Sequence, residues 1–427
     1  MTGLKAFDRA AIRSQYRPRI IDTTISDALS VFGGVNITGC KWCGKTWTGV
    51  FHSASSAYIG DKAGRSVAEM SPETALSGDE PRLIDEWQDV PDLWDVARYN
   101  MDVRNRKGMY IFTGSSSPPL RSTSHSGTGR FATVKMRPMS LFESGDSTGS
   151  ASLSDMIAGK QIKTAKSDMD YPAAIRLMCR GGWPSSMEMR DEDAVKIPMH
   201  YENRLIESDI SHLDGIKRSP DVMRHLLRSL ARNNATAAKV PVLADDMYES
   251  TGSVSEQTVR SYLNVLERMF VIEEQPPWYP SLRSRARMRV TPKRHFVDPS
   301  LAAAVMNAGP DALIADPNTS GFLFESLCYR DLCAYVAPLN GRVCHYRDNS
   351  GLEVDNIIEA GGRWGAIEVK LGHNEVDKAA SSLTRLKRKM EGEVPEPAFL
   401  AVVTATGGLA YVRDDGISVV PIDCLGP

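Results

Sequence analysis

The sequence predicts an α/β protein, and two observations favour this class. Strand-like runs at residues 35–38, 82–85 and 109–114 are separated by segments long enough for helices, which is typical of a parallel sheet. In the last third of the chain, three strand-like runs joined by glycine-rich turns precede a helical segment and a further strand. A mostly helical stretch lies between the two. The predicted domains are residues 1–190, 191–295 and 296–427.

The composition is that of an ordinary globular chain. Of 427 residues, 42% are hydrophobic and 24% are charged, which excludes wholesale disorder. At about 150 residues per domain, this length suggests roughly two to three domains. Lys and Arg number 51 and Asp and Glu number 53, a net charge of −2. This balance excludes a globally basic nucleic-acid coat protein, but it leaves room for a local basic patch.

The sequence carries no sign of export or membrane insertion. Residues 1–13 lack the apolar core of a signal peptide, and no uncharged apolar stretch of about 18 residues occurs. Seven cysteines are too few and too scattered for a disulfide scaffold. We therefore expect a cytoplasmic protein in a reducing compartment, with no membrane partner.

The first region contains a phosphate-binding motif. A helix-like segment at residues 21–31 and a strand-like run precede residues 39–46, which match G-x-x-x-x-G-K-[ST]. The glycines let backbone N–H groups close around phosphate oxygens, Lys45 brings positive charge to the β- and γ-phosphates, and Thr46 offers a hydroxyl to Mg²⁺. The predicted nucleotide-binding residues are Gly39, Cys40, Lys41, Trp42, Cys43, Gly44, Lys45 and Thr46.

Two carboxylates end the next strand-like run, Leu83-Ile84-Asp85-Glu86. Asp85 would reach the Mg²⁺ ion through water, and Glu86 would orient or deprotonate the attacking water. The alternative is a solvated strand end. We favour the catalytic interpretation because the pair follows the phosphate loop by about 40 residues, as a sheet of this type requires.

Residues after the third strand are further catalytic candidates. Thr113 or Ser115 would sense the γ-phosphate or position water, although a helix cap explains either residue as well. Arg130 ends a serine- and glycine-rich loop and is predicted to be an arginine finger, acting in cis or in trans. The alternative is an ordinary surface arginine. A finger acting in trans would require a homo-oligomer, which the sequence leaves open.

Cys40 and Cys43 form a C-x-x-C pair inside the phosphate loop. A redox function would need a thioredoxin-like context, which the flanking strand and helix contradict. We therefore interpret the pair as incidental. The alternative is that oxidation of the pair blocks nucleotide binding.

The helical middle resembles a helix-turn-helix. Amphipathic segments at residues 225–233, 240–247 and 259–270 surround a connection that contains Gly252, and an extended segment at 271–278 could open a wing. A module for protein interaction or a lid is an equal alternative.

A basic stretch follows the helical middle without an acidic residue. It contains Arg283, Arg285, Arg287, Arg289, Lys293 and Arg294. Alternating arginines would share one face of a strand and could lie along the phosphates of double-stranded DNA. The alternative is a solvated edge strand that positive charge protects from aggregation.

Charged residues also gather on the predicted C-terminal sheet. Glu353 and Asp355 are two residues apart on one predicted strand, so they face the same side of it, and the same holds for Glu368 and Lys370 on the next strand. Glu325 lies on a preceding predicted helix. A hairpin could bring them together, so that carboxylates hold Mg²⁺ while the lysine steers water at a phosphodiester. The alternative is a cross-strand salt bridge, which the apolar flanking residues disfavour because charges in a buried sheet need a reason.

Five segments together resemble bacterial and archaeal AAA-type ATP-binding proteins that carry a C-terminal domain of unknown function. These segments are GCKWCGKT, PRLIDEWQ, FTGSS, HSGTGR and MRPMSLFES. The resemblance implies a P-loop AAA-type parallel-sheet domain, a winged-helix-like middle and a restriction-endonuclease-like α/β domain of the PD-(D/E)xK type. It also implies ATP binding at Lys45, Thr46, Asp85 and Glu86. Cys40 departs from the family, in which proline is expected at this place.

The predicted function is an AAA-type ATPase that binds ATP and Mg²⁺, coupled to a Mg-dependent, nuclease-like domain that interacts with DNA. The alternative is an ATP-dependent switch whose nuclease-like domain is silent and holds a partner; a small-molecule kinase is weaker, because no acceptor pocket can be named. The predicted catalytic residues are Glu86, Ser115, Arg130, Asp355, Glu368 and Lys370. The predicted metal ligands are Thr46, Asp85, Glu325, Asp355 and Glu368.

Overall fold

The computed structural model describes residues 9–116, 127–210, 218–251, 254–280 and 291–427. The chain forms two compact units, which we call unit 1 (residues 1–138 with 268–270) and unit 2 (residues 139–267 with 271–427). Within the described ranges, none of the helices combines the length and apolar character that crossing a bilayer requires.

The unit boundary differs from the predicted boundary at residue 190. Residues beyond 138 belong to unit 2 because they pair with strands near the C-terminus: β6 (Ala151–Ser152) pairs with β16 (Leu425–Gly426), and β7 (Ala165–Lys166) pairs with β14 (Leu409–Val412). The predicted second and third domains also share this one compact unit. Strands of two to four residues have no strong periodicity, so these pairings could not be predicted from the sequence.

Unit 1 is built around a five-stranded sheet in the order β2-β3-β4-β1-β5, in which every described neighbouring pair is parallel. The strands are β1 (Gly34–Thr38), β2 (Ser55–Tyr58), β3 (Arg82–Asp85), β4 (Tyr110–Gly114) and β5 (Phe131–Lys135). The helices are α1 (Arg9–Gln15), α2 (Ile21–Val31), α3 (Lys45–His52), α4 (Lys62–Met70), α5 (Pro72–Leu76) and α6 (Asp92–Arg104). The parallel sheet predicted from the strand spacing is therefore confirmed, and α2 has the predicted bounds.

Aromatic packing holds one face of this sheet. Trp94 stacks on Trp87 and on Phe131, with ring centroids 4.8 and 4.0 Å apart, and Phe112 meets all three rings edge-on. These rings come from α6, the turn after β3, β4 and β5. Because parallel strands have their carboxyl ends at one edge, the loops after β1, β3 and β4 meet there.

The N-terminal half of unit 2 is mainly helical. Its helices are α7 (Leu141–Ser144), α8 (Leu153–Ile157), α9 (Tyr171–Arg180), α10 (Asp191–Ala194), α11 (Lys196–Arg204), α13 (Pro220–Arg232), α14 (Val240–Thr251) and α15 (Glu256–Arg268). The three predicted amphipathic segments correspond to α13, α14 and α15. An antiparallel pair follows them, β8 (Ile272–Gln275) with β9 (Lys293–Phe296). Three helices and a hairpin are the elements that a winged helix uses, but this order of elements does not by itself establish that fold.

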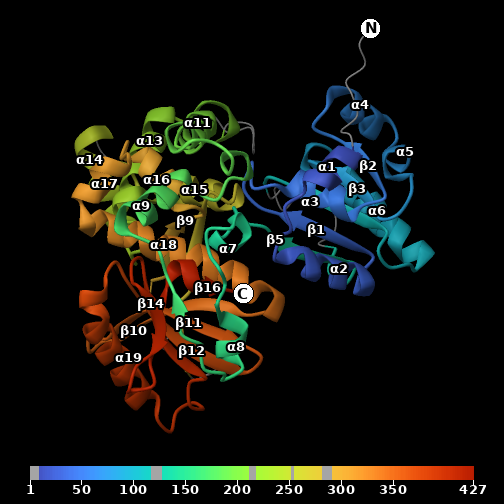
Figure 1. The fold of residues 1–427 in the computed structure, drawn as a ribbon. Helices are drawn as coiled ribbons and strands as arrows, with labels where there is room; N and C mark the ends of the chain where they lie inside the picture. The colour runs from blue at the N-terminus through green and yellow to red at the C-terminus, as the bar shows by residue number, and fades with distance from the viewer. Residues whose placement is uncertain (1–8, 117–126, 211–217, 252–253, 281–290) are drawn as a thin grey trace. The chain divides into compact units, whose positions relative to one another are not determined.

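The C-terminal half of unit 2 contains a mixed sheet in the order β10-β11-β12-β13-β15-β14-β7. Its other strands are β10 (Arg342–Arg347), β11 (Glu353–Ala360), β12 (Arg363–Lys370), β13 (Phe399–Thr404) and β15 (Ser418–Pro421). The helices are α16 (Pro299–Val305), α17 (Pro310–Ala315), α18 (Pro317–Val336) and α19 (Val376–Met390). Strands β10, β11 and β12, labelled in Figure 1, are antiparallel neighbours, as the predicted hairpins require. Strand β13 pairs with β12 in parallel, and α19 connects the two.

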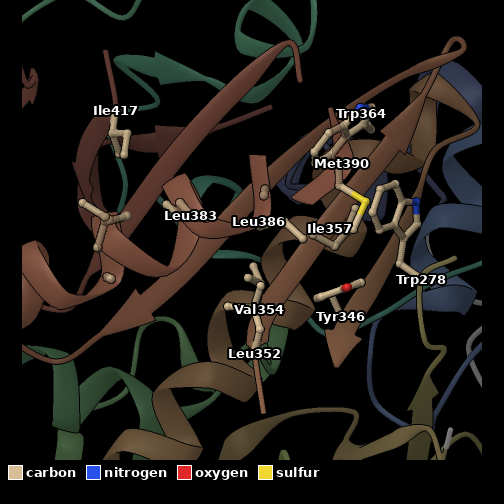
Figure 2. Packing of buried hydrophobic residues seen from close by; sticks show 14 of the residues in the cluster. Trp278, Tyr346, Leu352, Val354, Ile357, Trp364, Leu383, Leu386, Met390 and Ile417 are labelled. Atoms are coloured by element: carbon tan, nitrogen blue, oxygen red, sulfur yellow. The ribbon is translucent and has the colours of Figure 1, made fainter. Parts of the chain in front are cut away.

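The core of this half lies between the sheet and α19 (Figure 2). Leu383, Leu386 and Met390 of α19 are buried against strand residues, and Trp278 stacks on Trp364 with ring centroids 4.9 Å apart. Helix α18 packs against β10, β11 and β12 and, apart from Glu325, is buried from Leu323 to its end. Strands β11 and β12 therefore carry their side chains into a protein interior, where any charged group needs a partner.

Candidate functional site

Residues 39–44 form a loop between β1 and α3 whose shape depends on its glycines. A Cβ atom on Gly39 would lie 2.1 Å from the carbonyl oxygen of Met136, so a larger residue would collide with backbone. Gly44 has φ 106°, a conformation that side chains rarely adopt, and it leads directly into the first turn of α3. The loop therefore turns sharply and places the N-terminus of α3 at the carboxyl edge of the sheet.

Lys45 and Thr46 are the first two residues of α3. The Lys45 ammonium group donates a hydrogen bond of 2.7 Å to the carbonyl oxygen of Cys40, and the side chain is 5% exposed. Lys45 thus folds back over its own loop, where backbone N–H groups and the helix N-terminus already favour an anion.

Asp85 ends β3 opposite this helix terminus. Its Oδ1 atom accepts hydrogen bonds from the hydroxyl groups of Thr46, at 2.9 Å, and Thr113, at 2.5 Å. Burial raises the pKa of Asp85 to about 6, the adjacent Glu86 charge adds to this, and the hydrogen bonds oppose it. A threonine hydroxyl and a carboxylate are oxygen donors of the kind that Mg²⁺ prefers, so the donor set fits this ion.

Glu86 follows Asp85 with a left-handed backbone, φ 57°. Its Oε2 atom accepts a hydrogen bond of 3.0 Å from the Ser115 hydroxyl and another from the Gln88 amide. The structure therefore brings Asp85, Glu86, Thr113 and Ser115 together at the end of β3 and β4. Residues with φ above zero are uncommon outside glycine, and such strain clusters at functional sites.

Arg19 is a loop-supporting residue that the sequence did not reveal. Its guanidinium group is buried and donates to the carbonyl oxygens of Cys43, at 2.9 Å, and Arg137, at 2.8 Å. An isolated arginine ahead of a helix carries no motif. Its position becomes informative only once the loop is folded.

Both loop cysteines are buried, and neither forms a disulfide. Burial opposes ionisation of Cys43. A hydrogen bond with Cys40 and the positive charges of Lys45 and Arg19 outweigh it, so that the pKa of the Cys43 thiol falls to about 6.

Arg130 lies at the amino ends of the strands of the same sheet, opposite the carboxyl ends at which the phosphate loop begins. Its carbonyl oxygen accepts a hydrogen bond from Gly34 at the start of β1, whereas the phosphate loop follows the end of β1. Five residues of strand separate the two, about 16 Å at 3.3 Å per residue. The guanidinium group is half exposed and paired with Asp102. Within one chain, the structure therefore does not bring Arg130 to the phosphate loop, so the cis form of the predicted finger conflicts with this placement.

The predicted C-terminal residues do come together. Lys370 lies 2.8 Å from Glu368 and 3.6 Å from Asp355, and the backbone N–H of Val369 donates to Asp355 at 2.9 Å. The pairing of β10 with β11 shifts register between Cys344 and Tyr346, which places the extra residue of a bulge at Asp355–Asn356.

A second lysine, Lys293, occupies the centre of this group. Its ammonium group lies 2.7 Å from Glu325, 3.1 Å from Glu353 and 3.6 Å from Asp355. We call Lys293, Lys370 and the four carboxylates Glu325, Glu353, Asp355 and Glu368 the acidic cluster. The predicted Mg²⁺ site does not fit this arrangement, because a lysine already contacts each predicted ligand. Within the described ranges, no group of three or more His, Cys, Asp or Glu side chains is arranged to hold a metal ion.

Charges in the acidic cluster are strongly perturbed. Burial, and then the charge of Asp355, raise the pKa values of Glu325 and Glu368. Burial also opposes ionisation of Asp355, but Lys293 and Lys370 outweigh it and lower the pKa of Asp355. Asp355 is therefore the carboxylate that the two lysines keep ionised.

The predicted basic stretch divides at residue 291. Arg283, Arg285, Arg287 and Arg289 lie outside the described residues. Lys293 is 3% exposed, within the acidic cluster, and Arg294 pairs with Glu274 at 3.0 Å. The prediction that Lys293 contacts DNA phosphates therefore conflicts with its burial. Strand alternation was the available signal, because Lys293 and His295 point to one side of β9 and Arg294 points to the other.

Comparison with protein families matches three segments of the chain. Residues 33–144 match the AAA domain, residues 172–312 match a domain of unknown function (DUF8612), and residues 320–425 match another domain of unknown function (DUF4143). The first segment contains the phosphate loop, Asp85 and Glu86. Residues 33–144 therefore match an AAA domain in an α/β fold, which supports the predicted P-loop AAA-type domain.

Two curated relatives are similar over much of the chain, an uncharacterized protein of Mycobacterium bovis and one of Mycobacterium tuberculosis. Each is 27% identical to this chain over 303 residues. The match covers 70% of this chain and 60% of each relative, so the chain spans about three fifths of the length of the curated relatives it matches.

Among solved structures, the Walker-type ATPase of Pyrococcus abyssi is 13% identical, with a TM-score of 0.44, and the match covers 69% of this chain and 97% of that chain. The AMPPCP-bound DnaA of Aquifex aeolicus is 11% identical, with a TM-score of 0.27, and the match covers 58% of this chain and 86% of that chain. Neither likeness is close enough to bear on function.

Proposed function

We propose that unit 1 binds ATP with Mg²⁺ and hydrolyses it. The observation that carries this proposal is the hydrogen bond between Thr46 and Asp85 across the carboxyl edge of the sheet, beside the N-terminus of α3. This places a hydroxyl, a carboxylate and the Lys45 ammonium group around one anion-binding helix end. The AAA domain match over residues 33–144 supports the same function.

The residues divide the work between binding and chemistry. Backbone N–H groups of the loop and the Lys45 ammonium group bind the β- and γ-phosphates, while Thr46 and Asp85 would hold Mg²⁺, which neutralises charge that develops on the phosphate oxygens. Glu86 orients a water molecule and accepts its proton. Ser115 and Gln88 fix the Glu86 carboxylate by donating to Oε2. Arg19 stabilises the loop by donating hydrogen bonds to the carbonyl oxygens of Cys43 and Arg137.

The test of this proposal is labelled-ATP binding by the Lys45→Ala variant. We expect ATP retention to be lost, because neither the loop amides nor Mg²⁺ replaces the ammonium charge at the γ-phosphate. Lys62→Ala, an exposed lysine at the start of α4, is the matched control and should bind as the wild type does. ATP uptake by Lys45→Ala as tight as that of the wild type would refute the proposal.

For unit 2 we propose that ATP binding in unit 1 controls an element that holds double-stranded DNA without cutting it. Three helices followed by the β8–β9 hairpin support DNA binding. The pairing of both lysines with the predicted metal ligands favours a catalytically silent site. The alternative is a Mg-dependent nuclease, which the convergence of Asp355, Glu368 and Lys370 supports.

A plasmid assay separates these two functions. The protein is incubated with plasmid, Mg²⁺ or Mn²⁺, and ATP, and both DNA retention and strand breaks are measured. Retention without breaks, weakening steeply as salt rises, supports a DNA-holding element. Breaks that Asp355→Ala and Lys370→Ala each abolish would establish the nuclease.

A further inference from the structure

Lys293 reaches the acidic cluster from a distant part of the chain. The carboxylates come from α18, β11 and β12, whereas Lys293 is the first residue of β9. In the β8–β9 pair, Lys293 lies opposite Gln275. The Gln275 amide donates to the carbonyl oxygens of Cys344, at 3.1 Å, and Asp355, at 2.9 Å. Gln275 therefore ties the hairpin to the bulge of β11 and fixes where Lys293 enters.

The buried ammonium group of Lys293 supplies the positive charge that a bound metal ion would supply at the centre of the acidic cluster. An ammonium group has three N–H donors, and the Lys293 group faces three carboxylates at 2.7, 3.1 and 3.6 Å. A magnesium ion needs oxygen ligands at about 2.0–2.1 Å in octahedral geometry, so it cannot share this centre with the ammonium group. Lys370 covers the remaining side by contacting Glu368 and Asp355.

We propose that Lys293 is a built-in cation that fills the centre of the acidic cluster and excludes a divalent metal ion from it. The inference rests on the proposed DNA-holding function of unit 2 and explains why such a site is silent. Removal of Lys293 takes one positive charge from a buried group in which three carboxylates face its ammonium group. The cluster without its lysine therefore demands an external cation.

The inference predicts that a single substitution of Lys293 lets the acidic cluster bind a divalent metal ion in place of the lysine ammonium group. In Lys293→Met, the side chain keeps most of its length and loses its charge, so Glu325 and Glu353 lose their ammonium partner and Asp355 keeps only Lys370. The 427-residue protein, without nucleotide, is heated with and without MnCl₂. We expect a lower melting temperature for Lys293→Met, and a rise on the order of 5 °C when Mn²⁺ binds.

Controls assign the Mn²⁺ effect to the cluster. The wild type and Lys389→Met, which removes a surface lysine paired with Asp348, should shift by less than about 1 °C. The double variant Lys293→Met with Asp355→Asn should lose the Mn²⁺ rise. Absence of that rise in Lys293→Met overturns the inference.

The wild type provides a second test that does not depend on how Lys293→Met folds. Mn²⁺ bound by the wild type, measured by electron paramagnetic resonance without nucleotide, should be unchanged by Asp355→Asn. Loss of a bound ion in Asp355→Asn would overturn the inference, because metal would then share the cluster with Lys293. Plasmid cutting that depends on Asp355 would instead overturn the proposed function of unit 2.

Discussion

The phosphate loop and the acidic cluster use the same residue types in opposite arrangements. In unit 1, Lys45 donates to a carbonyl oxygen, while Asp85 accepts from the hydroxyl groups of Thr46 and Thr113. In unit 2, Lys293 and Lys370 contact the carboxylates directly. A lysine held apart from the carboxylate leaves both available for a metal and a phosphate. A lysine held against it neutralises the site from within.

The difference shows that carboxylates near lysine do not define a metal site by themselves. The desolvation cost of a buried carboxylate must be offset, and either a metal ion or a lysine can do this. Which one is used depends on where the chain delivers the lysine. In unit 1 the loop carbonyl of Cys40 holds it, and in unit 2 the β8–β9 hairpin inserts it.

The largest expected effect is on ATP hydrolysis by the site in unit 1. Glu86→Gln keeps the shape of the side chain but cannot accept a proton from water. We expect the rate of ATP hydrolysis to fall by about 10²–10⁴-fold while ATP binding is retained. Steady-state hydrolysis and labelled-ATP binding measure the two effects. Asp89→Asn, which changes a nearby carboxylate paired with Arg65, serves as control, and equal loss in both variants would contradict the role of Glu86.

A second prediction compares the two lysines by their effect on folding. Lys293→Met removes one partner of buried ion pairs, so the free energy of unfolding should fall by about 3–5 kcal/mol. Lys45→Met loses one hydrogen bond but also ends the burial of a charge, so we expect a change below about 1 kcal/mol. Denaturant unfolding in EDTA measures both. Equal destabilisation by the two substitutions would contradict the comparison.

The domain boundary and the two lysines show what the sequence could and could not predict. Strong periodicity identified α2, β1, β3, β4, α18, α19 and the strands β10–β12. The boundary at 138 was missed because β6 and β7 are two residues long and pair with strands some 250 residues later. Short strands are specified by their partners rather than by local pattern.

The candidate sites divide in the same way. The phosphate loop could be predicted because its binding residues are consecutive in the chain. Asp85 could be predicted because it ends a strand-like run. Lys293 was grouped with the neighbouring arginines because a run of positive charge does not reveal which member turns inward. Arg130 was placed near the nucleotide because sequence order does not tell which edge of a sheet a loop joins.

A third prediction uses the buried histidine beside Lys293. His295 stacks on Tyr329, and burial, with the charge of Lys293 and a contribution from His345, lowers its pKa to about 3, against a smaller opposing effect of Glu273. The unfolded chain therefore takes up a proton first as the pH falls below about 6.5. The stability contributed by neutral His295 is lost progressively between about 6.5 and 3, at about 1.4 kcal/mol per pH unit.

The measurement is the difference in unfolding free energy between the wild type and His295→Asn at pH 7 and pH 4.5. Other groups titrate in both proteins and cancel. We expect the advantage of the wild type to shrink by about 2–3 kcal/mol at the lower pH. A difference that does not change with pH would show that His295 is not held neutral.

The smallest expected effect concerns the support of Glu86. Ser115→Ala removes one donor to Oε2, and Gln88 remains, so the hydrolysis rate should fall by no more than about tenfold, equivalent to about 1.4 kcal/mol. Ser116→Ala, one residue further on, should leave the rate unchanged. A loss in Ser115→Ala as large as that in Glu86→Gln would mean that Ser115 has a direct part in the chemistry.

The most direct test of the contrast between the two sites is the number of Mn²⁺ ions that the wild type binds tightly in the presence of ATP, counted by electron paramagnetic resonance. We predict one ion per chain, lost in Asp85→Asn and retained in Asp355→Asn. Two ions per chain, one of which disappears in Asp355→Asn, would contradict the account.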